Sequence, residues 1–263
     1  METSSRSKIL IAIPAYNCAK QITRVLDEID NPLLERVAEI AIFDNRSSDS
    51  TVENALVYKK SDRLGKKLHI YRNVENYNLG GTHKVAFLRA KSQGYSHVII
   101  LHGDNQARSD EANALLDYAE AHPEQQTVLG SRFNKKSTLI GYAVKRILGN
   151  KVLNYAYSIM TLRKCEDLGS GLNLFFMDDL NIPTCLQFAD KMSFNYELLL
   201  NLIDRKVDFA YIPITWREED QVSNARNFNV FKTALINLYN WRFGKKYTKI
   251  KTPEDYKCKE IIQ

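Results

Sequence analysis

The sequence predicts an α/β fold built on a doubly wound, mostly parallel central sheet with helices on both faces. Two observations lead to this prediction. Short apolar runs rich in β-branched residues alternate with stretches whose apolar residues recur every three or four positions, which is the pattern of buried strands alternating with amphipathic helices. Polar turn residues separate the two kinds of segment. With 263 residues, of which 44% are apolar, the chain can fill the core that such a sheet requires.

The first half of the chain reads as four strands joined by three helices. Right-handed crossovers between parallel strands bring the carboxyl ends of all four to one rim of the sheet. The expected strands are Lys8–Ile13, Val37–Phe43, Lys67–Arg72 and the run that starts at His97, and the expected helices are Gln21–Ile29, Thr51–Lys60 and Lys84–Gln93.

The second half is less regular. Its expected helices are Asp110–Ala121, Val144–Tyr157 and Ser193–Ile203, and its expected strands are Thr127–Gly130, Leu174–Met177 and Phe209–Ile214. We expect residues 1–225 to form the main domain. Residues 226–263 are expected to form a basic, aromatic, helical extension that includes Trp241, Arg242, Lys245 and Lys246.

One aspartate is notable for its place at the end of a strand. The run Val98–Leu101 is continuously apolar, as in a strand buried on both faces, and the polar stretch HGDNQ (residues 102–106) follows it. Ligands of open α/β sheets bind outside the carboxyl ends of the strands. A carboxylate such as Asp104 suits Mg²⁺ or Mn²⁺ held against a diphosphate. The alternative is that Asp104 caps the next helix.

Composition narrows the classes of partner. The net charge of +6 and the sequence pI of about 9.0 favour acidic partners such as anionic lipid or phosphorylated small molecules. Nucleic acid is not expected, because the basic residues are spread out and no recognition module is readable. Neither a G-x-G-x-x-G fingerprint nor a P-loop is present.

The cysteines and the apolar runs bear on location. The four cysteines lie far apart without zinc-ligand spacing, which favours thiols in a reducing compartment. No apolar run approaches the roughly 20 residues that a membrane span requires. We therefore expect a cytoplasmic protein, or one that is peripheral on the inner face of a membrane.

Seven segments together resemble a known family. In order they are PAYN, FDNRSSDST, NLGG followed by Lys84, HGDNQ, GSRF, DLGSG and PITWR. They resemble motifs of the inverting family 2 glycosyltransferases of the GT-A fold, which begin with P-x-Y-N and D-D-G-S-x-D-x-T. Within that family the sequence is most similar to the polyprenyl-phosphate mannose and glucose synthase type. The resemblance runs from about Ile9 to Asn224, and it is specific through the order of the segments rather than through any one of them.

The resemblance implies a metal-dependent hexosyltransferase that uses a nucleotide-sugar linked to UDP or GDP. It also implies which residues bind the substrate, which hold the metal and which take part in catalysis. Pro14, Tyr16 and Asn45 would contact the base and ribose, and Arg132 and Arg217 would bind phosphate. The expected substrate-binding set also includes Asn17, Asp44, Lys84 and Arg146. The metal, Mn²⁺ or Mg²⁺, would be held by Asp104 with His102. The catalytic set would be Asp104 together with Asp167 and Glu197, which would lie near the acceptor.

Four positions depart from the family pattern. His102 stands where the family has the first acid of its metal motif, and Asn45 where it has the second acid of the early pair. Cys18 stands where a glutamate is usual, and Asn224 where the family has a late lysine. A neutral imidazole binds Mn²⁺ but is a poor ligand for Mg²⁺. His102 therefore either binds the metal or simply fills the end of the strand.

Three functions stay open from the sequence alone. The first is sugar transfer to a polyprenyl phosphate or lipid-linked acceptor at an anionic membrane surface, where no general base is needed because the acceptor oxygen is already charged. The second is transfer to a saccharide hydroxyl in polysaccharide or lipopolysaccharide synthesis, which needs a carboxylate base such as Asp167 or Glu197. The third is a nucleotide-binding protein without activity, and a homodimer is open in each case.

Overall fold

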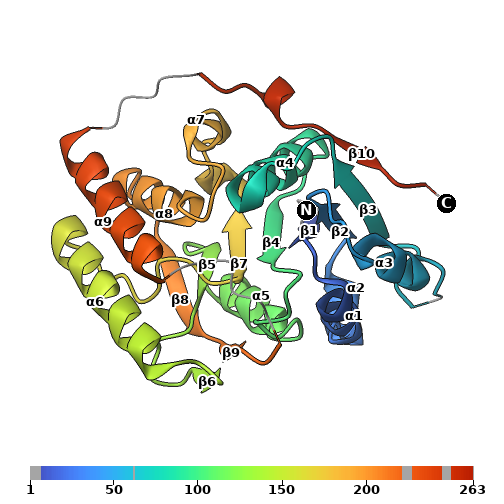
Figure 1. Ribbon diagram of the computed structural model, residues 1–263, viewed down its shortest axis with the longest axis horizontal. Helices are drawn as coiled ribbons and strands as arrows, with labels where there is room; N and C mark the ends of the chain where they lie inside the picture. The colour runs from blue at the N-terminus through green and yellow to red at the C-terminus, as the bar shows by residue number, and fades with distance from the viewer. Residues whose placement is uncertain (1–6, 62, 221–226, 245–249, 263) are drawn as a thin grey trace, which may run out of the picture.

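The computed structural model describes residues 7–61, 63–220, 227–244 and 250–262. Lys245 and Lys246 of the expected extension lie outside these residues. Within the described part, an eight-stranded sheet with the order β10-β3-β2-β1-β4-β7-β5-β8 forms the centre of the molecule (Figure 1). Its strands are β1 (Ile9–Ala15), β2 (Glu39–Asp44), β3 (Leu68–Asn73), β4 (His97–Leu101), β5 (Thr127–Ser131), β7 (Leu172–Phe176), β8 (Phe209–Pro213) and β10 (Cys258–Glu260).

The sheet is mostly parallel, as the sequence predicts. Strands β3, β2, β1 and β4 run parallel to one another, and β5 runs parallel to β8. Strand β7 is antiparallel to both β4 and β5, and β10 is antiparallel to β3. A separate small sheet pairs β6 (Thr138–Ile140) with β9 (Thr215–Arg217).

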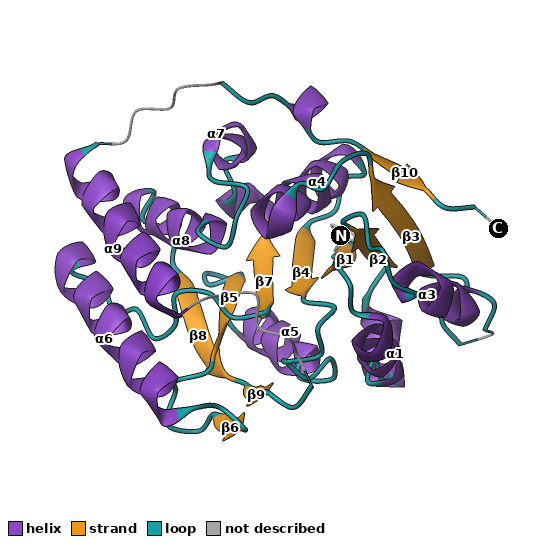
Figure 2. Cartoon of the chain, in the orientation of Figure 1, coloured by secondary structure: helices purple, strands orange, loops and turns teal. Residues whose placement is uncertain are grey.

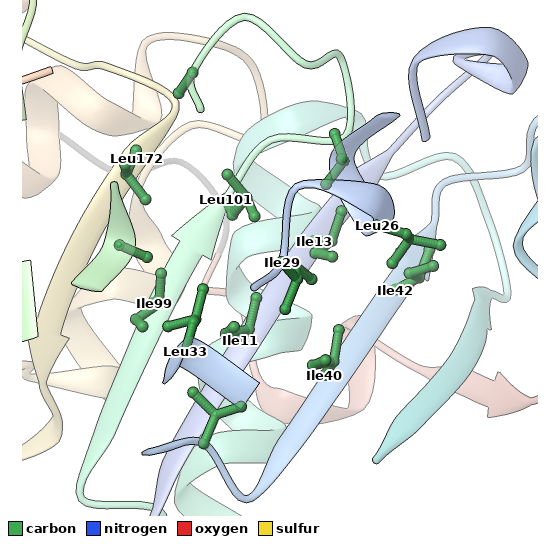
Figure 3. Packing of buried hydrophobic residues seen from close by; sticks show 14 of the residues in the cluster. Ile11, Ile13, Leu26, Ile29, Leu33, Ile40, Ile42, Ile99, Leu101 and Leu172 are labelled. Carbon is green, nitrogen blue, oxygen red and sulfur yellow. The ribbon is translucent and has the colours of Figure 1, made fainter. Parts of the chain in front are cut away.

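Helices cover both faces of the sheet (Figure 2). Alternate side chains of β1 point to opposite faces, because the side-chain period of a strand is two. Ile11 and Ile13 pack with the helical residues Leu26 and Leu33 on one face, as Figure 3 shows. The helices are α1 (Ala19–Asp27), α2 (Asn31–Arg36), α3 (Thr51–Lys59), α4 (Asn78–Ser92), α5 (Ala112–Ala121), α6 (Val144–Thr161), α7 (Ile182–Gln187), α8 (Phe194–Asp204) and α9 (Asn227–Phe243).

Side chains at the centre of the sheet are fully buried on both of its faces. Leu10 on β1 and Phe87 on α4 belong to a second buried apolar cluster, which lies on the face opposite Ile11. Each such side chain contributes roughly 1.5–3 kcal/mol when it is removed from water. The predicted arrangement of a doubly wound sheet is therefore confirmed, and it fixes the strand ends on which the candidate site is built.

The C-terminal part differs from the expected helical extension. Helix α9 accounts for residues 227–243, but Cys258–Glu260 forms β10, which pairs with the edge strand β3 in the register Cys258 to Asn73. An edge strand presents unpaired backbone groups, and β10 satisfies those of β3. Three residues are too few for a periodic signal, so the sequence pattern did not predict this strand.

Candidate active site

The loops that follow β1, β2 and β4 meet at one rim of the sheet, as predicted. The backbone N–H of Asn45 donates to the carbonyl oxygen of Ala15 at 2.8 Å, and the N–H of Gly103 donates to the carbonyl oxygen of Pro14 at 3.0 Å. His102 N–H donates to the carbonyl oxygen of Gly171 at 2.8 Å. The rim therefore joins residues 14–17, 44–51, 102–106 and the turn at 167–171.

The β1 and β2 loops are tied to each other by side chains. Asn17 N–H donates to Ser47 Oγ at 2.9 Å, and Ser48 N–H donates to Asn17 Oδ1 at 2.8 Å. Asn17 adopts a left-handed backbone with φ of 49°, which asparagine tolerates better than most residues. Tyr16 beside it is 47% exposed. The expected nucleotide residues thus form one loop pair, with the Tyr16 ring accessible.

Asp44 and Asn45 are both buried at the end of β2. Asp44 accepts a hydrogen bond from Arg72 Nε at 2.8 Å and another from Ser47 N–H at 3.1 Å. Asn45 Oδ1 accepts from Asn73 Nδ2 at 3.0 Å and from the N–H of Tyr77 at 2.8 Å. Asn45 Nδ2 in turn donates to Asn76 Oδ1 at 2.9 Å. Asn45 therefore fastens the β2 loop to the residues that precede α4, and it does so partly with an amide donor that a carboxylate lacks.

Asp104 and His102 lie at the end of β4, where the sequence places them. Asp104 is half-buried, and its Oδ1 accepts from Gln106 N–H at 3.2 Å. His102 Nε2 is 3.3 Å from His83 Nε2 of α4, so one ring donates to the other. Burial lowers the pKa of His83 well below its ordinary value, with His102 adding to the effect. The pKa of His102 is also lowered by burial, which outweighs the opposite influence of Asp104.

Gly171 lies against the His102 ring, with little room for a side chain. A Cβ at Gly171 would lie 3.0 Å from ring atoms of His102, which is tighter than ordinary van der Waals contact. The glycine of the turn thus lets β4 and β7 approach at the point where the His102 ring sits.

The donor set at the strand end limits which metal fits. Among the described residues no group of three or more His, Cys, Asp or Glu side chains gathers to hold an ion. A divalent ion on Asp104 would take most of its ligands from diphosphate and water. One carboxylate with an imidazole nearby fits Mn²⁺ better than Mg²⁺, because Mn²⁺ accepts nitrogen more readily.

Arg132 and Asp167 lie together at the ends of β5 and the turn before β7. Arg132 Nε donates to Asp167 Oδ2 at 2.7 Å, and Nη2 donates to Oδ1 at 2.6 Å. Both side chains are almost fully buried, and the guanidinium lies 4.9 Å from the centre of the Trp216 ring. The two residues expected to bind phosphate and to face the acceptor therefore neutralise each other in this structure.

The other two arginines of the expected set are also paired with carboxylates. Arg217 donates to Glu28 from Nη1 at 2.8 Å and from Nη2 at 3.0 Å. Arg146 pairs with Glu218, and its guanidinium lies 4.7 Å from the centre of the Tyr142 ring. A phosphate that binds to any of these arginines has to compete with a carboxylate that is already in place.

Lys84 and Glu197 lie on helices beneath the rim. The Lys84 side chain has no exposed surface, and its Nζ donates to Asp190 Oδ1 at 2.6 Å and to Tyr256 Oη at 3.0 Å. Glu197 is buried in the first turn of α8 and accepts from Ala189 N–H at 2.6 Å. The geometry thus assigns Lys84 to joining α4 with the C-terminal segment, and its substrate contact stays a prediction.

Sequence reasoning missed Arg72 and His83, which contact residues of the expected site. Arg72 is the last residue of the predicted strand Lys67–Arg72, so its position at the rim could have been predicted from the sequence. His83 could not be found in this way, because it lies within a helix and its contact with His102 depends on how α4 packs against β4.

A cavity of about 700 Å³ adjoins the rim. Its wall is formed by α3, the end of β3 and strand β10, and it includes Arg46, Arg72 and Lys259. It therefore borders the Asp44–Arg72 pair, whereas Asp104 is not part of its lining.

Comparisons with known proteins agree with this architecture. A family model described as Glycosyl transferase family 2 matches residues 10–181. A dolichyl-phosphate beta-glucosyltransferase from Saccharomyces cerevisiae is 23% identical over 242 residues, which cover 85% of this chain and 71% of the relative. The Drosophila melanogaster protein of the same description is 21% identical over 235 residues, covering 84% of this chain and 70% of its own.

Solved structures give the same fold. Glucosyl-3-phosphoglycerate synthase from Mycobacterium tuberculosis, in complex with UDP, has a TM-score of 0.62 and 18% identity and covers 89% of this chain and 80% of its own. The same enzyme with Mn²⁺, UDP-glucose and phosphoglyceric acid has a TM-score of 0.62 and 17% identity, with the same coverage.

The strand order, the helices on both faces and the loops at one rim are those of the GT-A fold, which the solved structures share. Because the family model matches more than half of the sequence, the chain belongs to glycosyl transferase family 2. Membership of the family that the sequence segments resemble is thereby confirmed.

Proposed function

We propose that this enzyme transfers a hexose, most simply glucose, from a UDP-sugar to a polyprenyl phosphate, with inversion at the anomeric carbon. The observation that carries the proposal is the match along 85% of the chain to a relative described as a dolichyl-phosphate beta-glucosyltransferase. The structural neighbour that holds Mn²⁺, UDP-glucose and a phosphate-bearing acceptor supports the donor and the chemical class of the acceptor.

The donor would lie across the rim. Tyr16 offers an exposed ring for the base, and the buried Asp44 with Arg72 offers polar partners on the side of β2 and β3. Asp104, with His102 beside it, would hold a divalent cation, preferably Mn²⁺, which supplies positive charge to the leaving diphosphate. These assignments to substrate and metal are part of the proposal.

The acceptor chemistry follows from charge. The oxygen of a lipid phosphate is anionic, so it can attack the anomeric carbon without a base to remove a proton. The buried pairing of Asp167 with Arg132 agrees with this, because both oxygens of that carboxylate already accept hydrogen bonds from the guanidinium. Arginines that stabilise developing negative charge act most strongly where water is excluded.

The test is a transfer assay with matched donors and acceptors. Purified enzyme with Mn²⁺ would receive UDP-glucose or GDP-mannose, together with a polyprenyl phosphate, the corresponding polyprenol or an oligosaccharide. The proposal expects glycosylated lipid only with UDP-glucose and the polyprenyl phosphate. Transfer to the oligosaccharide but not to the lipid phosphate would overturn it.

A further inference from the structure

Helix α6 exposes an apolar stripe along its whole length. Val144, Leu148, Val152, Tyr155 and Ile159 are 69%, 59%, 58%, 69% and 53% exposed. Their spacing of three or four residues places them on one face of the helix. At 1.5 Å per residue, the stripe from Val144 to Ile159 extends over roughly 23 Å of the 18-residue helix. Single exposed apolar residues are ordinary on a protein surface, but five in register mark an interaction site.

The opposite face of α6 is held on the protein. Leu153 and Tyr157 are buried, and Tyr157 Oη donates to the carbonyl oxygen of Ala234 in α9 at 2.8 Å. The helix is thus fixed in rotation, and the stripe faces away from the core. Among the described residues no helix is long and apolar enough to cross a bilayer.

Helix α9 lies beside α6 at the edge of the molecule (Figure 1) and repeats the pattern. Leu235, Ile236, Tyr239 and Phe243 are 40%, 46%, 63% and 68% exposed. Trp241 on the same helix donates from Nε1 to Asp204 at 2.8 Å, which fastens α9 to α8. Two neighbouring helices therefore present large apolar side chains while their other faces pack on the domain.

The charges on these helices identify the partner. Neither α6 nor α9 contains an Asp or Glu, whereas α6 carries Lys145, Arg146 and Lys151, and α9 carries Lys232 and Arg242. At 100° per residue, Lys145 and Lys151 lie about 60° to either side of the stripe. A lysine in that position can lay its stem along the apolar surface and extend its ammonium group to a phosphate.

We propose that α6 and α9 dock the enzyme on an anionic lipid bilayer, with the apolar stripe at the level of the acyl chains and the lysines among the headgroups. This is the arrangement of an in-plane amphipathic helix. A second copy of the chain fits less well, because helices that carry only positive charge repel each other. The membrane docking rests on the proposed function in one respect only, namely that the acceptor in the bilayer is a polyprenyl phosphate.

Docking of α6 also orients the active site. Arg146 in the first turn of α6 pairs with Glu218, the residue that follows Arg217 of β9. The helix therefore begins beside one side of the candidate site. A polyprenyl phosphate has its reactive group in the headgroup layer, so a membrane-bound α6 brings that layer to the arginines of the rim.

Vesicle co-sedimentation tests the proposal. The triple variant Leu148→Ser, Val152→Ser, Tyr155→Ser changes only exposed side chains, and Val57→Ser, also exposed, is the matched control. We expect wild type and the control to bind vesicles of phosphatidylcholine with phosphatidylserine, and the triple variant to bind about tenfold less. The variant Lys145→Gln, Lys151→Gln should bind less to anionic vesicles and lose most of the salt dependence.

Several outcomes would overturn the docking surface. One is equal vesicle binding by wild type and the triple variant. Another is a wild type that forms a dimer and binds no vesicles, while the triple variant is a monomer. Transfer to a short, water-soluble prenyl phosphate should be unchanged in the triple variant. If wild type glycosylates no lipid phosphate, yet the triple variant loses vesicle binding, the proposed function fails and the docking surface stands.

Discussion

Arg132 holds Asp167 through two parallel hydrogen bonds of 2.7 and 2.6 Å, and Asp167 also accepts from the backbone N–H of Arg132 at 2.9 Å. The pair joins the end of β5 to the turn that precedes β7. Because both side chains are nearly inaccessible to water, removing either one would leave the other as a buried charge without a partner. The pair is therefore structural in this state, whatever part Arg132 takes once a phosphate is bound.

Asp167→Asn should destabilise the fold, because it leaves the Arg132 cation buried without its anion. We expect a loss of about 3 kcal/mol in the free energy of unfolding. Urea denaturation followed by circular dichroism measures it, with the exposed Asp117→Asn on α5 as control. The double variant Arg132→Met, Asp167→Leu should lose less than the single variant. A single variant as stable as the control would contradict this reading of the pair.

Glu197→Gln tests whether the reaction needs a carboxylate base. If the acceptor is a lipid phosphate, no proton has to be removed, so turnover should stay within about tenfold of wild type. The glutamine also retains an oxygen that can accept from Ala189 N–H. Steady-state transfer to polyprenyl phosphate gives the rate. A loss of about 1000-fold with donor binding intact would instead support a base and a hydroxyl acceptor.

The ionisation of Asp190 makes the stability of the fold depend on pH in the acid range. Burial raises its pKa, but hydrogen bonds from Lys84, Tyr256 and Lys251 outweigh burial, and the net pKa is lower than the ordinary 3.8. The unfolded chain then binds this proton more readily, so the contribution of Asp190 to stability is present above about pH 4 and is lost as the pH falls through the native pKa.

The comparison of wild type with Asp190→Asn makes this measurable. At neutral pH the variant should be about 2 kcal/mol less stable, because Lys84 stays buried without its anion. The difference should shrink as the pH is lowered from about 6 to about 3. Urea titrations across this range give the difference at each pH. A difference that is independent of pH would contradict the role assigned to the carboxylate.

Arg46 occupies a left-handed backbone position with φ of 67°. It stands in the β2 loop, where the family motif that this loop resembles has glycine. Left-handed backbone costs most residues roughly 1–2 kcal/mol, and glycine little. Arg46→Gly should therefore be more stable than Arg46→Ala by about 1 kcal/mol. Both variants remove the same charge, so their thermal unfolding can be compared directly. Equal midpoints would show that the loop is not strained at this residue.

The sequence predicted the strands and the rim because those features depend on local patterns. The apolar run Val98–Leu101 predicts a buried strand. The right-handed connections between parallel strands then place Asp104 on the same rim as Asn17 and Asp44. The antiparallel direction of β7 and the pairing of β10 with β3 are not local, since they depend on which edge a distant segment reaches.

Side-chain partners were the least predictable part of the site. Arg132 and Arg217 were expected to bind phosphate, and Arg146 was expected to bind substrate. Each of the three has a carboxylate partner in the structure. Sequence spacing does not disclose such pairs, because Glu28 and Arg217 lie far apart in the chain. Lys84 shows the same limit, since its burial follows from the packing of α4 against the C-terminal segment.

The central claim is that Asp104, at the end of β4, holds the divalent cation that binds the donor diphosphate. Calorimetric titration of UDP, with and without Mn²⁺, into wild type, Asp104→Asn and the control Asp117→Asn tests it most directly. The account predicts Mn²⁺-dependent binding in wild type and control, and binding about 100-fold weaker in Asp104→Asn when Mn²⁺ is present. Equal Mn²⁺-dependent affinity in Asp104→Asn and wild type would contradict it.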